Sequence, residues 1–183
     1  MFRRRCGSIL VIDAGADPAC SLFDLGNAIR KAEIDFGISV AMTEPLHLYA
    51  RERIETDSDL ETTARGFAYG TIDYGGGHTG RLLYIKPSFL SMIPADVRSY
   101  GAEHALFPHE STLDQWFSES QFESYRTLGR YQVADLISSI GNGDLPAAFD
   151  AAHSAVQQRP FAKTAGVIDI DQARASAGNA AAD

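Results

Sequence analysis

Cysteine is scarce in this sequence, which has only Cys6 and Cys20 among its 183 residues. The two do not form a Cys-x-x-Cys pair, so the sequence does not support a zinc site or a thioredoxin-type redox site. So few cysteines are typical of a protein in a reducing, cytoplasmic compartment. We interpret both as partly buried small apolar residues.

Long apolar runs are also absent, and no stretch approaches the roughly 18 consecutive apolar residues of a membrane-spanning helix. The basic start at Arg3–Arg5 precedes an apolar run, Ile9–Ile12, that is too short for a secretory signal and has no small-residue cleavage site after it. We therefore expect a cytoplasmic protein without a membrane span.

Basic residues are in the minority, with 16 Lys and Arg against 24 Asp and Glu, for a net charge of -8. Sequence-independent nucleic-acid binding needs a basic face, so this balance argues against a nucleic-acid partner. It also argues against attraction to an anionic membrane surface. Apolar residues make up 45% of the chain and charged residues 22%, as in an ordinary folded domain.

Hydrophobic patterning near the start of the chain predicts a βαβ unit. The four apolar residues Ile9–Ile12 are typical of a strand in the middle of a parallel sheet that is covered on both faces. A helix is expected next, with Ser21 as its N-cap and Gly37 as its end. Residues 38–42 then predict a second strand, joined to the first by a right-handed crossover. The apolar stripe of the helix consists of Leu22, Leu25, Ile29, Ala32 and Phe36.

The remaining segments predict a β-hairpin followed by helices. We interpret the acidic residues 43–64 as a solvated loop or edge segment, and Gly75-Gly76-Gly77 as the turn of the hairpin. We expect a helix capped by Ser111 or Thr112, whose apolar stripe includes Leu113, Trp116 and Phe117. The two strands of the hairpin are predicted at 66–74 and 80–86. Helices are predicted at 94–100, at 112–140 with one interruption near 118–120 or 129, and at 146–157. Gly141-Asn142-Gly143 should end the long helix, and residues 173–183 should form a frayed tail.

Three motifs resemble known catalytic or binding patterns but occur in the wrong context. Gly37-Ile38-Ser39-Val40-Ala41 is near a nucleophile elbow, yet it follows a helix and precedes a strand, the reverse of what that turn requires. The glycine run at 75–77 connects strand to strand, whereas phosphate loops lead into a helix. His104 and His109, with Glu103 and Glu110, could ligate a metal in principle, but Pro108 interrupts any helical ligand spacing.

The loop after the first strand is the more interesting candidate site. Asp13 and Asp17 follow the strand at its carboxyl end, where open α/β sheets place their ligands. Asp13 could be a general base, a metal ligand or, most often in such turns, a hydrogen-bonding loop anchor. We take Asp13, Gly15 and Asp17 as candidate site-lining residues. We assign no catalytic residue, metal ligand or cofactor.

Two segments, residues 3–37 and 81–129, resemble large bacterial patatin-like phospholipases in the same order along the chain. The distinctive pieces are DAGADP, DLGNAIRK, FPHESTLDQWF and QFESYRTLG. The resemblance implies a three-layer α/β acyl hydrolase related to cytosolic phospholipase A2, acting on lipids through a Ser–Asp dyad. The serine of that family lies in Gly-x-Ser-x-Gly, and the aspartate lies in Asp-Gly-Gly or Asp-Gly-Ala.

This chain contains no Asp-Gly dipeptide. Asp13-Ala14-Gly15 matches the strand after the dyad aspartate in the family, so both catalytic residues are expected before Met1. An all-apolar strand so early in the chain likewise predicts partner strands upstream. We therefore expect the C-terminal part of such an enzyme, inactive alone and dependent on an N-terminal portion or a partner chain. In the full-length parent it would be cytoplasmic or peripheral to a membrane.

The expected divisions are residues 1–42 as the last βαβ portion of the catalytic sheet, residues 43–140 as a hairpin and helical cap, and residues 141–183 as a short helix with a disordered Ala-rich tail. Two other interpretations remain open. In the first, the chain is a non-catalytic α/β binding or interaction module that uses the Asp13–Asp17 loop or an exposed sheet edge. In the second, it is an enzyme in its own right that uses Asp13 with His104, His109 or Ser111.

Overall fold

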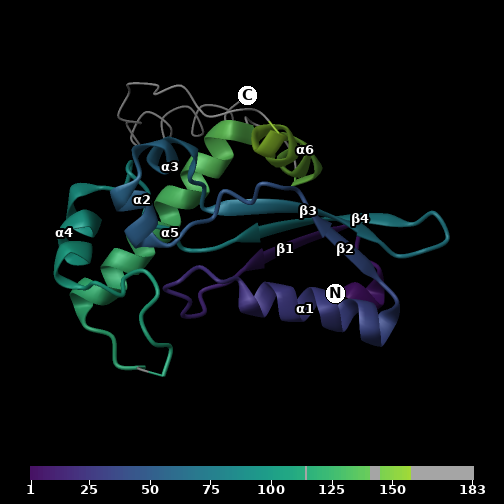
Figure 1. Ribbon diagram of the computed structural model, residues 1–183, viewed down its shortest axis with the longest axis horizontal. Helices are drawn as coiled ribbons and strands as arrows, with labels where there is room; N and C mark the ends of the chain where they lie inside the picture. The colour runs from purple at the N-terminus through teal and green to yellow at the C-terminus, as the bar shows by residue number, and fades with distance from the viewer. Residues whose placement is uncertain (114, 141–144, 158–183) are drawn as a thin grey trace, which may run out of the picture.

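The computed structural model describes residues 1–113, 115–140 and 145–157. Within them, one mixed sheet lies between helices on its two faces, which confirms the predicted α/β class (Figure 1). The strands are β1 (Ser8–Ile12), β2 (Ser39–Met42), β3 (Phe67–Asp73) and β4 (Thr79–Ile85). The helices are η1 (Phe2–Arg4), α1 (Phe23–Phe36), α2 (Arg51–Thr56), α3 (Ser58–Thr63), α4 (Ala95–Glu103), α5 (Glu119–Ile140) and α6 (Leu145–Gln157).

The strand order is β1-β4-β3-β2. β3 and β4 form the predicted antiparallel hairpin, β1 runs parallel to β4, and β2 runs antiparallel to β3. β1 and β2 therefore point the same way, as a βαβ unit requires, but they lie on opposite edges with the hairpin between them. The hairpin takes the centre because most of its side chains are buried on both faces of the sheet.

The central position predicted for the first strand is wrong for the described part of the chain. β1 is an edge strand, and its outer edge pairs with no other described strand. Ile9 is buried, whereas Leu10 is 41% exposed and Ile12 is 66% exposed. Leu10 and Ile12 are exposed because the helix on their side of the sheet, α6, packs on β3 and β4 and does not extend over β1.

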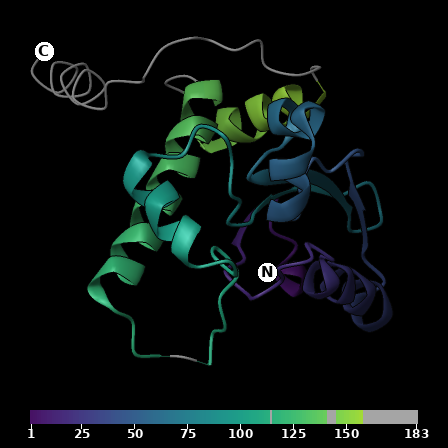
Figure 2. The same ribbon diagram turned by 60° about the vertical axis from the view of Figure 1, so that its left-hand side comes forward.

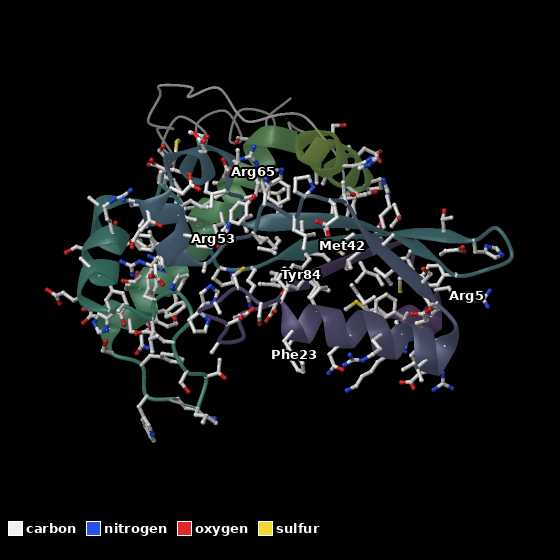
Figure 3. All side chains as sticks on the ribbon, viewed as in Figure 1. Arg5, Phe23, Met42, Arg53, Arg65 and Tyr84 are labelled. Carbon is white, nitrogen blue, oxygen red and sulfur yellow. The ribbon has the colours of Figure 1, made fainter. Side chains whose placement is uncertain are left out.

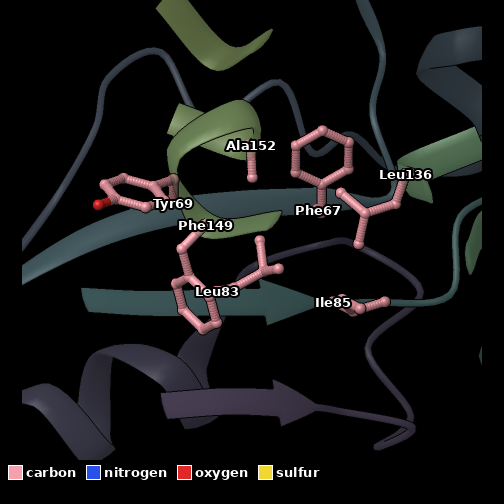
Figure 4. Packing of buried hydrophobic residues seen from close by; sticks show 7 residues of the cluster. All are labelled: Phe67, Tyr69, Leu83, Ile85, Leu136, Phe149 and Ala152. Atoms are coloured by element: carbon pink, nitrogen blue, oxygen red, sulfur yellow. The ribbon is translucent and has the colours of Figure 1, made fainter. Parts of the chain in front are cut away.

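Each face of the sheet has its own apolar core. α1 covers one face, where Ile9, Ile72 and Leu82 form one buried cluster and Leu25 packs with Tyr84 in a neighbouring one. On the other face, α5 and α6 pack over the hairpin, as Figure 4 shows. That cluster consists of Phe67, Tyr69, Leu83, Ile85, Leu136, Phe149 and Ala152. Burial of each large apolar side chain contributes about 1.5–3 kcal/mol, which fixes both helical layers on the sheet.

A further apolar cluster joins α4 and α5. The two helices lie at the end of the sheet toward which β1 points (Figure 1), and Figure 2 shows them side by side. Its buried members are Phe89, Ile93, Val97, Phe107 and Leu128. The guanidinium of Arg51 on α2 stacks 4.0 Å from the centre of the Phe89 ring and donates to the carbonyl of Gly101 at 2.8 Å. These contacts attach α2 to the apolar cluster between α4 and α5.

Two predicted features of the first helix have different outcomes. α1 ends at Gly37, whose φ of 64° is the left-handed conformation expected there. The predicted Ser21 N-cap is wrong, because the helix begins at Phe23 and its N-cap residue is Leu22, whose apolar side chain cannot cap it. The backbone N–H and the hydroxyl of Ser21 instead donate to the carboxylate of Asp17, both at 2.9 Å.

The acidic segment 43–64 is not simply a loop, since it contains α2 and α3. The Asp57 side chain caps α3 by accepting from the backbone N–H groups of Asp59 and Leu60. Acidic residues in the first turn of each helix also favour the helical form, because the N-terminal end of a helix carries partial positive charge.

The long helix begins seven residues later than predicted, at Glu119. Ser118 caps it by accepting from the Gln121 N–H at 3.1 Å, so Ser111 and Thr112 are not its caps. The expected stripe residues Leu113, Trp116 and Phe117 are consequently exposed.

The predicted short helices at 94–100 and 146–157 correspond to α4 and α6. The predicted stop at 141–143 and the tail at 173–183 lie outside the described residues. Over the described chain, no helix has the length and apolar character needed to cross a bilayer.

Candidate functional site

The candidate site forms where two neighbouring parallel strands end. Ile12 of β1 is in register with Ile85 of β4, and the Asp13 N–H donates to the Ile85 carbonyl at 2.9 Å. The next residue on each strand, Asp13 or Lys86, is therefore brought to the same edge of the sheet. This is the carboxyl end of both strands, the usual place for ligands in open α/β folds.

A buried charge pair lies at this edge. The Lys86 ammonium group is 3.2 Å from Asp13 Oδ2 and donates to the Gly15 carbonyl at 3.1 Å. The Tyr84 hydroxyl donates to the same Asp13 oxygen, and the Gly15 N–H donates to Asp13 Oδ1 at 2.8 Å. Lys86 is only 2% exposed. A Cβ at position 15 would lie 2.9 Å from Asp13 Oδ1, so a larger residue there would displace the Asp13 carboxylate.

These contacts keep Asp13 charged. Burial opposes the charged form, but the hydrogen bonds from Tyr84, Gly15 and Lys86 together outweigh it and lower the pKa of Asp13 below its ordinary value. Burial and the Asp13 carboxylate raise the pKa of Tyr84, so Tyr84 remains a neutral donor. A carboxylate held by three donors is a weak general base, and the geometry gives Asp13 the role of a loop anchor.

Asp17 anchors the second half of the same loop. Its carboxylate accepts from the Ser21 N–H, the Ser21 hydroxyl and the Leu22 N–H, all within 2.9 Å. These bonds hold Cys20 and Leu22 at positive φ values of 48° and 54°, a conformation that non-glycine residues rarely adopt. The same bonds outweigh the effect of burial and lower the pKa of Asp17.

His109 reaches this cluster from the segment between α4 and α5. It is 6% exposed, and its Nδ1 atom has no hydrogen-bond partner among the described residues. Burial, followed by the charge of Lys86, lowers the pKa of His109, while Asp17 and the Gly15 backbone oppose that shift. His109 is therefore a neutral imidazole beside the Asp13–Asp17 loop at physiological pH.

Cys20 lies in the same loop but is not poised as a nucleophile. Burial and the negative charge of Asp17 raise the pKa of its thiol to about 11. The thiolate is the reactive form of cysteine, so a thiol with so high a pKa stays unreactive at neutral pH.

The candidate metal ligands His104, His109, Glu103 and Glu110 do not form one site. His104 stacks on Tyr100, with ring centres 4.0 Å apart, and its Nδ1 lies 3.4 Å from Glu110 Oε1. His109 instead faces the Lys86 cluster. Over residues 1–113, 115–140 and 145–157, no three His, Cys, Asp or Glu side chains are grouped as metal ligands would be.

The remaining motifs take structural places. Ser39 lies in β2 and is exposed, so the near-match to a nucleophile elbow is an ordinary strand. Gly75, Gly76 and Gly77 form the hairpin turn, all with φ between 64° and 80°. The hydroxyl of Ser111 accepts from the Leu113 N–H at 3.3 Å.

Two members of the cluster, Tyr84 and Lys86, were not predicted from the sequence as site residues. Lys86 ends the otherwise apolar run Leu82–Lys86, and a lysine directly after a buried strand was the available signal for a buried ion pair. The sequence could not show that Asp13 is the partner of Lys86, because the two residues are 73 positions apart and meet only through the pairing of β1 with β4.

Comparison with known proteins adds no relative, since no protein-family model, curated protein or solved structure matches the chain.

Proposed function

We propose that this chain is the C-terminal part of a patatin-like lipid acyl hydrolase whose Ser–Asp dyad is carried by polypeptide outside the chain. The proposal starts from the resemblance of residues 3–37 and 81–129 to that family. The observation that carries it in the structure is the unpaired outer edge of β1 among the described strands.

The edge of β1 has the chemistry of an interior strand. Leu10 and Ile12 project on the side of the sheet that α5 and α6 leave uncovered at this edge, and both are exposed. An apolar edge strand whose outer N–H and C=O groups pair with no described strand is a template for a further strand. Pairing there would complete the backbone hydrogen bonds and bury both side chains, each contributing about 1.5–3 kcal/mol when fully buried.

The Asp13–Lys86 cluster fits a supporting role in such an enzyme. Acyl transfer needs a nucleophile, a base and donors for the oxyanion. Asp13 is held by three donors, and the Cys20 thiol is protonated at neutral pH, so neither supplies the nucleophile. We infer that the cluster keeps the Asp13–Asp17 loop rigid beside a dyad contributed from the far side of β1.

The free thiols of Cys6 and Cys20 are consistent with a reducing compartment, and we propose a cytoplasmic location for the enzyme.

The direct test is to read the genomic sequence in frame upstream of the Met1 codon and express the longer polypeptide. We expect an Asp-Gly-Gly shortly before Arg3 and a Gly-x-Ser-x-Gly further upstream. The longer protein should hydrolyse phospholipid, and changing the upstream serine to alanine should abolish hydrolysis. If the upstream sequence contains neither motif, and no separate chain supplies them, the proposal is wrong.

A matched pair of variants tests the role of the β1 edge in that longer protein. Ile12→Lys places a charge on the exposed side of β1 and should reduce both activity and solubility. Ile34→Lys alters a residue that is 73% exposed on α1, and it should leave both unchanged. Equal activity of the two variants would mean that no strand packs beside β1.

One observation favours the second candidate, a non-catalytic binding module. The described chain already buries separate apolar clusters on both faces of its sheet, so it has the core of an independent domain. Cooperative unfolding of the isolated, monomeric chain, together with an upstream sequence that lacks the dyad, would favour the module.

The third candidate, an enzyme in its own right, predicts hydrolysis of a p-nitrophenyl ester by the isolated chain. We expect no rate above that of the buffer. A measurable rate that falls in His109→Gln would instead make the chain itself catalytic.

A further inference from the structure

His109 lies at the boundary between the candidate site and the segment that joins α4 to α5. Its ring reaches the cluster of Asp13, Tyr84 and Lys86, where Figure 3 labels Tyr84 between the sheet and α1. The Nδ1 atom of His109 is fully buried and has no hydrogen-bond partner among the described residues. Buried polar atoms of folded proteins rarely lack a partner, so a change of protonation at this nitrogen has a large effect on its surroundings.

Charged groups face His109 from two elements besides its own segment. Lys86, directly after β4, disfavours a second positive charge next to it. Asp13 and Asp17, in the loop after β1, favour such a charge, but other donors already bind both carboxylates. Glu110, the next residue on the segment of His109, is bound by side chains of α4 and α5. The carboxylates around His109 are therefore committed to other partners.

The folded arrangement fits a neutral His109 ring. Neutral imidazole with its proton on Nε2 leaves Nδ1 as an acceptor without a donor. A protonated ring would place a charged donor at the same buried position, without an acceptor among the described residues and beside the Lys86 ammonium group. Burial and then the charge of Lys86 accordingly lower the pKa of His109. Protonation of His109 is therefore favoured only when the ring leaves this position.

His109 is held in a short turn that has a buried side and an exposed side. Phe107 is fully buried beside α4 and α5, whereas Leu106 is 58% exposed. The His109 N–H donates to the Leu106 carbonyl at 2.6 Å, and the Glu110 N–H donates to the Tyr125 hydroxyl at 3.2 Å. This turn and the loop after β1 lie side by side in Figures 1 and 2. A movement that starts at His109 can therefore separate the turn from the loop while Phe107 stays in its core.

We propose that His109 is a pH-dependent switch. The neutral ring holds residues 108–110 against the Asp13–Asp17 loop, and the protonated ring releases them, so that water reaches the Asp13–Lys86 pair. Lys86 is only 2% exposed in the closed arrangement, so opening would change its surroundings most. All the groups involved belong to the described chain. The switch therefore goes beyond the proposed function and operates with or without an upstream polypeptide.

Amide hydrogen exchange, measured by NMR on the isolated chain, tests the switch. The reporter is the Glu110 N–H, whose bond to the Tyr125 hydroxyl breaks when residues 108–110 move away. From about pH 7.5 to about pH 5.5, uptake of one proton should increase its opening equilibrium by up to about tenfold, after correction for the intrinsic exchange rate. Low urea concentrations should leave this exchange unchanged, because a local opening exposes little surface. Amides of β3 and β4 should instead follow urea steeply, since they exchange through global unfolding.

Two histidine variants separate His109 from its neighbour on the same segment. His109→Gln keeps a polar side chain that stays neutral, and it should remove the pH dependence of opening at Glu110. His104→Gln is the matched control, because the His104 side chain is 44% exposed and its Nδ1 lies 3.4 Å from Glu110 Oε1. A charged His104 attracts Glu110 and favours the closed turn, so His104→Gln should not weaken the pH dependence. Equal losses in the two variants would contradict the proposal.

The wild-type chain alone decides the question if His109→Gln does not fold. Exchange at Glu110 that does not change with pH after correction overturns the switch. Exchange that depends on urea as steeply as that of β3 and β4 also overturns it, because the turn then opens only when the whole chain unfolds. None of these measurements involves hydrolysis, so failure of the switch does not bear on the dyad, and absence of an upstream dyad does not bear on the switch.

Discussion

Lys86 and Asp13 form a buried ion pair across the carboxyl ends of two parallel strands, with Lys86 Nζ 3.2 Å from Asp13 Oδ2. The two side chains differ in their access to water, since Lys86 is 2% exposed and Asp13 is 18% exposed. Asp13 also accepts from Tyr84 and Gly15, whereas the Lys86 ammonium group also donates to the Gly15 carbonyl. Lys86 therefore depends on Asp13 for the stabilisation of its charge more than Asp13 depends on Lys86.

This asymmetry predicts unequal costs of removing each partner. Asp13→Asn leaves a buried ammonium group without its counter-ion and should lower the free energy of unfolding by about 3–5 kcal/mol. Lys86→Met leaves a carboxylate that keeps two donors and some water, and should cost about 1.5–3 kcal/mol. Urea denaturation at neutral pH measures both. The double variant should cost less than the sum, and additivity would show that the pair is not coupled.

The lowered pKa values of Asp13 and Asp17 predict sensitivity to acid. A carboxyl group whose pKa is lower in the folded than in the unfolded state stabilises the fold above its unfolded pKa, here 3.8. That contribution is lost as the pH falls below 3.8 through the folded pKa. Asp17→Asn should reduce stability at neutral pH and flatten the acid limb. Unfolding curves from about pH 5 to about pH 2 measure this, and an unchanged slope would argue against the Asp17 bonds.

His109 predicts a separate loss of stability at mildly acidic pH. Its folded pKa lies below the ordinary value of 6.5, so the folded state favours neutral imidazole. Stability should be fully present above pH 6.5 and decline as the pH falls through the folded pKa. Burial and Arg65 give His47 a shift of the same sign. His109→Gln should remove part of the decline between about pH 7.5 and about pH 5, and His47→Gln a further part. A decline that persists in the double variant would contradict this assignment.

The edge position of β1 predicts opposite outcomes at two similar residues. Ile9→Ala empties a site that is 2% exposed and should destabilise the isolated chain by about 2–4 kcal/mol. Ile12→Ala alters a side chain that is 66% exposed and should change stability by less than about 0.5 kcal/mol. Thermal or urea unfolding of both variants measures the contrast. Equal costs would mean that β1 is covered on both faces even in the isolated chain.

Local patterns in the sequence determined most secondary structure correctly. The hairpin, its glycine turn and the end of α1 at Gly37 follow from alternation and from positive φ, which are properties of neighbouring residues. Helices α2 and α3 were not predicted in the acidic segment. The two errors in helix capping occurred where a polar side chain could form more than one local hydrogen bond. Ser21 bonds to Asp17 instead of capping α1, and Ser118 caps α5 in place of Ser111.

Local sequence patterns could predict only part of the candidate site. Asp13, Gly15 and Asp17 could be located because loops at the carboxyl ends of buried strands are favourable places for ligands. Their role could not be derived, because it depends on Tyr84 and Lys86, more than 70 positions away. The resemblance to patatin-like enzymes names a reaction for this edge of the sheet, and that assignment remains a proposal.

The sequence by itself determined the α/β composition, the four strands, most of the helices and the negative charge, because each depends on residues close together in the chain. Only the tertiary structure decided that β1 lies at an edge, that Lys86 pairs with Asp13 and that Trp116 is exposed. Each of these depends on which distant segments meet. That choice is made by the packing of the whole molecule, and no short stretch of sequence contains it.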